Sequence, residues 1–263
     1  MCRQICSKLK QDQHQSAAAD YLLRDILNRT ITEPEVIRER VKYVGLDYEG
    51  NYVLLLLSFQ VSNNVPVSYA ANVFKSLFPS ARVFLYQNDI LMLMSLRKLS
   101  ETKFRHQMEE VKRRLEPELG RQKMKAVASK SFRTIADIGT AYEQCRIGLL
   151  FGRGEKDFVY YEDHWLRHML YLCDREIPLT SFCEPVIWEI AAEKKSGAVP
   201  PLTILRTYLE NDRNLTYCAK TLHMHRNNVL YHITRLAERY NLNLDDSEQR
   251  LRLLISLKIY EYQ

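Results

Sequence analysis

The chain has 263 residues, 46% of them apolar, which is enough material for about two domains with hydrophobic cores. Its 38 basic and 32 acidic residues give a net charge of +6, which is compatible with an anionic partner without identifying one. No run approaches the roughly 18 apolar residues of a membrane span, and MCRQICSKLKQDQHQ lacks the apolar centre of a signal peptide. We therefore expect a soluble, cytoplasmic protein with no membrane partner.

The six cysteines do not form a recognisable metal or disulfide pattern. None lies in a Cys-x-x-Cys pair, and no nearby histidine spacing completes a zinc site. We expect reduced, mostly buried thiols, and neither a metal nor another cofactor. The cysteines are Cys2, Cys6, Cys145, Cys173, Cys183 and Cys218.

Residues 1–45 predict a helical lead-in. Residues 1–15 are polar and are expected to fray, or to be the remnant of a longer segment. The stretch AAADYLLRDILNR places apolar residues at helical spacing. EPEVIRERVKYVG predicts a second helix, with Pro34 in its first turn and Gly45 at its end.

Residues 46–165 alternate strand and helix patterns. NYVLLLLSF predicts a central strand covered on both faces, because its apolar run is continuous. ARVFLYQNDILMLMSL predicts a hairpin with its turn at Gln87-Asn88-Asp89. Helices are predicted in VPVSYAANVFKSLF, ETKFRHQMEEVKRRLEPEL and ADIGTAYEQCRIGLLFG, and strands in KMKAVAS and DFVYYED. The order β-α-β-β-α-β-α-β predicts an α/β domain with a mixed sheet.

From residue 166 the pattern is wholly helical. Residues 166–198 are expected to form a helical connector, and Lys194 to Pro201 (KKSGAVPP) has the composition of a hinge. Residues 199–263 predict an all-α domain with helices in LTILRTYLEND, LTYCAKTL, RNNVLYHITRLAERY and SEQRLRLLISLKIYE. Asp245 is expected to cap the last helix, with Glu248 reaching back.

The two middle segments have the spacing of a helix-turn-helix unit. Such a unit needs a small residue where its helices cross, a residue that tolerates positive φ at the turn, and an apolar plug on the second helix. Ala219, His223 and Val229 meet these needs in turn, since His is enriched at positive φ. Leu222 and Met224 flank the turn and are expected in the core.

The second helix of this unit has two different sides. At 100° per residue, Val229 shares a side with Ile233, Leu236 and Tyr240, and Leu230 and Ala237 lie at its margins. The opposite side holds Asn227, Asn228, Tyr231 and Arg235, and the first turn holds His225 and Arg226. Between residues 213 and 240, five basic residues face one acid, Glu238, which gives a net charge of +4.

Two interpretations of the polar side remain open. Asn can bond bidentately to adenine and Arg to guanine in the major groove, which the N-terminal end of a recognition helix enters first. Alternatively, the polar side is an ordinary solvated face, on which Asn227 and Asn228 serve only as helix caps.

At these residues the sequence resembles the C-terminal helix-turn-helix of the PucR/CdaR family of bacterial transcription regulators. The matching features are LRTYLEND, A-x-x-LH-x-HRN, L-Y-x-I-x-R-L and L-x-LDD-x-x-x-RL-x-L, within about 60 residues. The resemblance implies double-stranded DNA as the partner and puts His225, Arg226, Asn227 and Asn228 at the start of the recognition helix. Family members often have Thr at the position of Asn228 and Arg near His232, so the base preference stays open.

For a helix-turn-helix bound to DNA, we expect the roles of these residues to divide. Base contacts are expected from His225 to Asn228 and from Tyr231. Because one helix reaches few base pairs, a homodimer is expected. Phosphate contacts are expected from Arg213, Lys220, Arg235 and Arg239.

Residues 46–165 resemble the GGDEF-like, nucleotide-cyclase-like domain that often precedes this module in the family. A cyclase needs carboxylates for Mg²⁺ and glycines beside the nucleotide. The first strand here ends in Ser58, Phe59 and Gln60, without an acid, and the signature turn is YQNDI. Asp89 is interpreted as a turn residue, so we expect a degenerate domain without cyclase activity that dimerises or binds an effector or upstream sensor.

Other candidate sites are weaker. Gly152 and Gly154 are interpreted as a helix stop and a turn. His164 and His168 are four apart but lack a third metal ligand, and Trp165 and Trp188 are interpreted as core or interface residues. The alternatives to a DNA-binding regulator are a nucleotide-binding or cyclase-like enzyme with a helical appendage, and a protein-interaction adaptor that has lost DNA binding.

Overall fold

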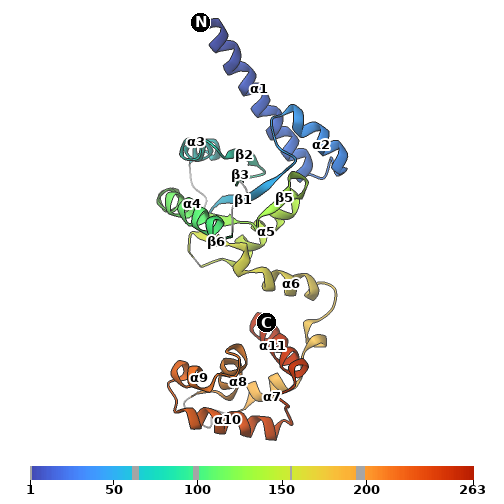
Figure 1. Ribbon diagram of the computed structural model, residues 1–263, viewed down its shortest axis with the longest axis vertical. Helices are drawn as coiled ribbons and strands as arrows, with labels where there is room; N and C mark the ends of the chain where they lie inside the picture. Colours follow the sequence, from blue (N-terminus) through green and yellow to red (C-terminus); the bar gives the residue numbers. More distant parts are fainter. Residues whose placement is uncertain (1, 61–64, 97–100, 155, 194–198) are drawn as a thin grey trace. The chain divides into compact units, whose positions relative to one another are not determined.

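The computed structural model describes residues 2–60, 65–96, 101–154, 156–193 and 199–263, with side chains omitted for residues 2–14, 101 and 102. The chain forms two compact units, Met1–Leu166 and Arg167–Gln263 (Figure 1). Most of the hinge expected at Lys194 to Pro201 lies outside the described residues. Each unit has its own hydrophobic core and is described by itself.

The first unit is built on a mixed sheet with the predicted long strand at its centre. The main strand order is β2-β3-β1-β4-β6, and β5 also pairs with β1. All these pairs are antiparallel except β4 with β6. The strands are β1 Glu49–Phe59, β2 Arg82–Tyr86, β3 Asp89–Ser95, β4 Met124–Ala128, β5 Phe132–Thr134 and β6 Phe158–Tyr160.

Helices cover both faces of the sheet. Leu54 and Leu56 of β1 belong to the core beneath α1, α2 and α5. Their neighbours Leu55 and Leu57 belong to the core beneath α3 and α4, which lie on the other side of the sheet in Figure 1. This arrangement explains why the sequence of β1 is apolar at successive positions. The helices are α1 Cys2–Leu27, α2 Pro34–Tyr43, α3 Val67–Leu77, α4 Glu101–Gln122 and α5 Ile138–Phe151, with 3₁₀ turns η1 Ile135–Asp137 and η2 Tyr161–Asp163.

Two expectations for this unit were wrong. Residues 2–15 are helical as the start of α1 rather than frayed, and this stretch contains neither Gly nor Pro and is rich in Lys and Gln, which favour helix. The strand β5 was missed because three residues, FRT, are too short to show alternation. The strand β5 forms because it pairs with the start of β1, where Tyr52 lies opposite Phe132.

Close packing of α5 on β4 predicts opposite effects for two Gly→Ala substitutions. A Cβ added at Gly148 of α5 would lie 2.4 Å from Val127 Cγ1, whereas one at Gly120 of α4 would meet nothing within 4 Å. Ala favours a helix over Gly by about 1 kcal/mol, but overpacking costs about 1–3 kcal/mol. Gly120→Ala should therefore stabilise the protein and Gly148→Ala should destabilise it by about 1 kcal/mol, measured by urea denaturation. A Gly148→Ala protein as stable as Gly120→Ala would contradict this packing.

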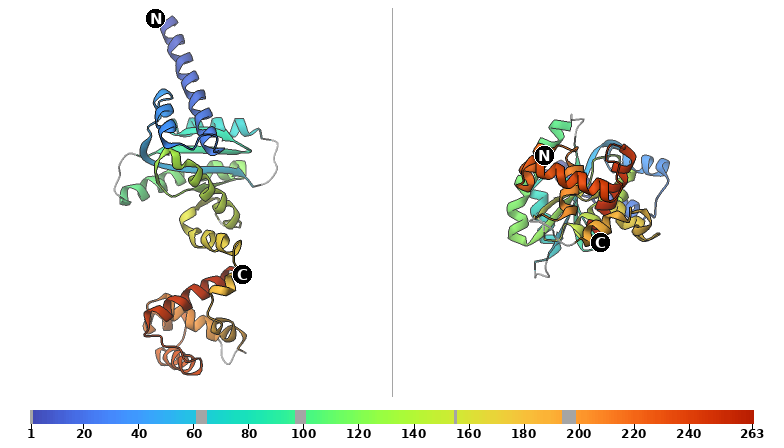
Figure 2. Two further views of the ribbon diagram at one scale, coloured as in Figure 1. Left: turned by 90° about the vertical axis from the view of Figure 1, so that its right-hand side faces the viewer. Right: turned by 90° about the horizontal axis from the view of Figure 1, so that it is seen from below.

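In the described residues of the second unit, all regular structure is helical. Ile187 and Ile190, from the segment expected to connect the domains, pack in one core with Ile204 and Leu205 of the C-terminal helices. The four C-terminal helices predicted from the sequence are all present. The elements, shown also in Figure 2, are α6 Trp165–Asp174, η3 Leu179–Phe182, α7 Val186–Ala192, α8 Pro201–Glu210, α9 Leu215–Leu222, α10 Arg226–Arg239 and α11 Ser247–Tyr262.

The expected cap of α11 was one residue out of place. Asp246, not Asp245, accepts hydrogen bonds from the backbone N–H groups of Glu248 and Gln249, at 3.1 and 3.4 Å. Gln249, rather than Glu248, reaches back, to the N–H of Asn243. Asp245 instead forms an ion pair with Arg213, a contact between segments that local sequence does not reveal.

The described cysteines are free thiols. Cys145 and Cys218 are buried, Cys183 is half-buried and Cys173 is exposed. Burial raises the pKa of the Cys145 thiol far above its ordinary value, so it stays protonated. Within the described part of the chain, no helix is both long and apolar enough to cross a membrane.

Candidate nucleic-acid interface

The turn between α9 and α10 has the predicted helix-turn-helix geometry. His223 ends α9 in the left-handed conformation, with φ 52° and ψ 42°. The next N–H, of Met224, donates to the carbonyl of Ala219 at 2.9 Å. This bond closes the turn over the small residue and directs the chain into α10.

The apolar side of α10 is buried as its spacing predicts. Val229, Ile233 and Leu236 are at most 5% exposed and lie in the core of the second unit, and Tyr240 packs against it. Leu230, at the margin of the stripe, is 43% exposed and belongs to the open side of the helix. Because the apolar side of α10 is packed in the core, the opposite side faces outward.

The first turn of α10 is capped by His225. Its Nδ1 accepts a hydrogen bond from the backbone N–H of Asn227 at 3.3 Å, so the other ring nitrogen, Nε2, is not used by the cap. Asn227 and Asn228 are exposed, and no side-chain bond of either is present among the described residues. The expectation that these two residues would serve as caps is therefore wrong, and both interpretations of this side as an exposed face remain open.

The predicted basic residues fall into two groups. Lys220, Arg226 and Arg235 are exposed, and the described residues include no acid within ion-pair distance of them. Arg213 Nη1 instead forms an ion pair with Asp245 Oδ1 at 2.5 Å, and Arg239 Nη1 pairs with Glu193 Oε1 at 3.2 Å. The structure thus gives Arg213 and Arg239 intramolecular partners that the sequence did not predict.

One exposed aromatic residue was not among the predicted contacts. Tyr217 of α9 is 53% exposed and lies one turn before Lys220. Tyr231 of α10, which was predicted, is 59% exposed and its ring meets His232 edge-on at 5.6 Å between centroids.

At the end of the sheet where a cyclase would hold its metal, the side chains of this protein bond to one another. Gln60 Nε2, just past β1, donates to Asp157 Oδ1 at 2.7 Å. Asp89 begins β3 after the turn, is 6% exposed, and faces Arg146 with 3.8 Å between the charged atoms. The described residues contain no group of three or more His, Cys, Asp or Glu side chains positioned to hold a metal ion.

The weaker candidates have ordinary structural places. Gly152 follows the end of α5 and Gly154 adopts φ 82° in the turn beyond it. His164 is buried just before α6. Trp188 packs against the second core, edge-on to Tyr260, whereas Trp165 is half exposed.

Two family models match the chain, one within each of the two units. The family model described as "PucR C-terminal helix-turn-helix domain" matches residues 202–259, and the one described as "GGDEF-like domain" matches residues 28–149. No curated protein sequence matches the chain. Among solved structures, the chain is similar to a regulator of polyketide synthase expression from Bifidobacterium adolescentis, with 14% identity and a TM-score of 0.43 over 91% of this chain and 92% of that chain. With a GGDEF-like domain followed by a PucR C-terminal helix-turn-helix domain, the chain is a PucR/CdaR-type transcription regulator.

Proposed function

We propose that this regulator recognises specific double-stranded DNA sequences by inserting the N-terminal end of α10 into the major groove. The observation that supports this most directly is the outward side of that helix. It presents the Arg226 guanidinium and the Asn227 and Asn228 amides to solvent, while the opposite side is fixed in the core. Among the described residues these groups have no protein partner that would explain their presence.

The chemistry of the proposed contacts follows from the donors and acceptors. Arg226 can donate two parallel bonds to the O6 and N7 of guanine, and an Asn side chain can pair with the N6 and N7 of adenine. His225 is exposed and its Nε2 is not used by the cap, so this nitrogen can add a hydrogen bond at the start of the helix. Tyr231, one turn beyond Asn227, offers a ring and a hydroxyl group further along the groove.

Phosphate contacts are proposed mainly for Lys220 and Arg235. Each is an exposed cation without an acidic partner in the described chain, so binding a phosphate would break no existing ion pair. Arg213 and Arg239 would first have to leave Asp245 and Glu193, and we assign them the smaller share. We also propose that the hydroxyl group of Tyr217 donates a hydrogen bond to a DNA phosphate.

This division predicts the salt dependence of DNA binding. Lys220→Ala should flatten the slope of log K against log salt by about one unit per protomer. Arg213→Ala should change the slope less, because its charge is already neutralised by Asp245. Binding titrations at several salt concentrations would measure both slopes. Equal flattening by Lys220→Ala and Arg213→Ala would contradict the division.

We also propose that the protein binds as a homodimer. One recognition helix touches only a few base pairs, so two copies on a repeated half-site are needed for selectivity. Analytical ultracentrifugation with a DNA fragment should find two protomers per site. A single protomer bound with full selectivity would contradict the proposal.

An enzymatic role for the GGDEF-like domain is the alternative from another class. We propose that it has no cyclase activity, because Ser58, Phe59 and Gln60 provide no carboxylate for Mg²⁺ and Asp89 already faces Arg146. Incubation with GTP and Mg²⁺ should give no product, and turnover would overturn this view. The second alternative, an adaptor without DNA binding, would be supported if no sequence were enriched from a random DNA library.

A further inference from the structure

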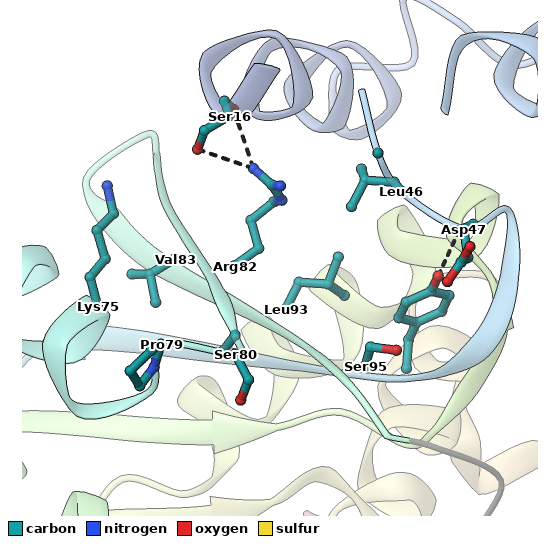
Figure 3. A pocket seen from close by; sticks show the side chains of 13 residues that line it. Ser16, Leu46, Asp47, Lys75, Pro79, Ser80, Arg82, Val83, Leu93 and Ser95 are labelled. Carbon is teal, nitrogen blue, oxygen red and sulfur yellow. Dashed lines mark hydrogen bonds between the residues drawn. The ribbon is translucent and has the colours of Figure 1, made fainter. Parts of the chain in front are cut away.

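A cavity of about 490 Å³ lies at one end of the sheet in the first unit (Figure 3). At this end Arg82 of β2 pairs with Leu93 of β3, whereas Tyr86 and Asp89 pair beside the hairpin turn at the other end. The cavity is therefore separate from the place where a cyclase would hold its nucleotide. Its walls come from α1, the α2–β1 loop, α3, the α3–β2 loop and the three strands between them.

Two cationic side chains line one end of this cavity. Arg82 Nη1 donates to the Ser16 carbonyl at 3.2 Å, to Ser16 Oγ at 3.3 Å and to Asp20 Oδ1 at 3.4 Å. All three contacts are at the long limit for hydrogen bonds, so a stronger acceptor could compete for this group. Lys75 of α3 has no ion-pair partner among the described residues, and Figure 3 shows it extending in the same direction as Arg82.

The charges near this end do not balance. Asp20 is the one acid that Arg82 meets there among the described residues, and its side chain is 20% exposed. Burial raises the pKa of Asp20, while the nearby charges of Arg82, Lys75 and Arg24 act to lower it. Arg82 and Lys75 both line this end of the cavity and meet this one carboxylate, which leaves an excess of one positive charge there.

The other end of the cavity has a different character. Leu46, Tyr52 and Leu93 give it an apolar and aromatic wall, and Asp47 lies beside them. The Tyr52 hydroxyl donates to the Asp47 carbonyl at 2.6 Å, and burial raises the Tyr52 pKa to about 12, so the ring stays neutral. The Asp47 carboxylate would repel a second negative group, so a fitting ligand has its negative charge at one end only.

We propose that this cavity binds a small organic anion, with its carboxylate or phosphate group between Lys75 and Arg82 and its body against Tyr52 and Leu93. Such a ligand would bind where Arg82 of β2 already meets Ser16 of α1, and would exchange part of these long hydrogen bonds for its own. All these groups belong to the first unit, so the proposal does not depend on the DNA contacts of α10.

The test uses the full chain and two simple anions. Thermal unfolding is followed during titration with inorganic phosphate or with acetate, at constant ionic strength maintained with chloride. At least one of the two should give a saturable rise in Tm, as a ligand of the folded state must. The anion that binds more tightly shows whether the natural ligand carries a phosphate ester or a carboxylate.

Matched variants locate the effect. Lys75→Gln should weaken anion binding by about threefold to fivefold, the scale of an exposed ion pair. Lys42→Gln removes the same charge from α2, where Lys42 pairs with Glu39, and should change binding little. Arg82→Lys keeps the charge but removes the planar donors, and should also weaken binding. Absence of saturable stabilisation by either anion, or equal losses in Lys75→Gln and Lys42→Gln, would overturn the proposal.

Discussion

Arg226→Ala is expected to weaken binding to a selected DNA site by about 1–3 kcal/mol per half-site, which is about fivefold to 150-fold. The reason is that its guanidinium, in the first turn of α10, is exposed and unpaired within the described chain, so its main proposed partner is the base edge. In a symmetric dimer both half-sites lose this contact, so the total loss of binding free energy is about twice as large. Binding sites would first be enriched from a random DNA library, and affinities then measured by fluorescence anisotropy.

A matched control separates a lost base contact from a lost charge. Arg252→Ala removes one positive charge from α11, where Arg252 pairs with Glu248 and Glu184. We expect this variant to bind the selected site within about threefold of the wild type, the range of a weak surface ion pair. If Arg252→Ala weakened binding as much as Arg226→Ala, the effect would be one of net charge, and α10 would not be the reading element.

Ile233→Ala is expected to destabilise the second unit by about 2–5 kcal/mol. Ile233 is 4% exposed and packs with Val229 and Leu236 on the buried side of α10, so truncation leaves a cavity in this core. Because typical domains are stable by only about 5–15 kcal/mol, this loss is a large share of the total. DNA binding should fall with it, since the outward side of α10 is oriented only while the inner side is packed.

Leu230→Ala is the matched control on the same helix. Leu230 is 43% exposed, so the same kind of truncation should cost less than about 1 kcal/mol. Urea denaturation of the fragment 167–263, followed by far-ultraviolet circular dichroism, would compare the two variants. The first unit has a separate core and should keep its transition in the full-length Ile233→Ala protein. Equal destabilisation by both substitutions would contradict the assignment of the buried side.

The features predicted successfully are those encoded by local pattern. The central strand β1 follows from its continuous apolar run, and the turn at His223 follows from its spacing to Ala219 and Val229. The buried side of α10 follows from 3.6-residue periodicity alone. In each case the physical cause, burial or a required φ, acts within a few residues of the sequence.

The features missed depend on partners distant in sequence or on a choice between neighbours. The sequence did not show that Arg213 and Arg239 form ion pairs with Asp245 and Glu193, which lie 32 and 46 positions away. Asp245 and Asp246 are equally good caps by sequence, and the ion pair to Arg213 accounts for the use of Asp246. The cavity near Arg82 combines segments from α1 to β3, and no local motif indicates it.

The most direct test of the proposed DNA recognition is a loss-of-contact experiment with Arg226→Ala. Each base pair of the selected site is changed in turn, and binding by wild-type and variant protein is compared. The wild type should lose about 1–3 kcal/mol at each contacted position, whereas the variant should become indifferent at one position per half-site and stay selective elsewhere. Unchanged discrimination by the variant at every position would show that α10 does not read the bases through this residue.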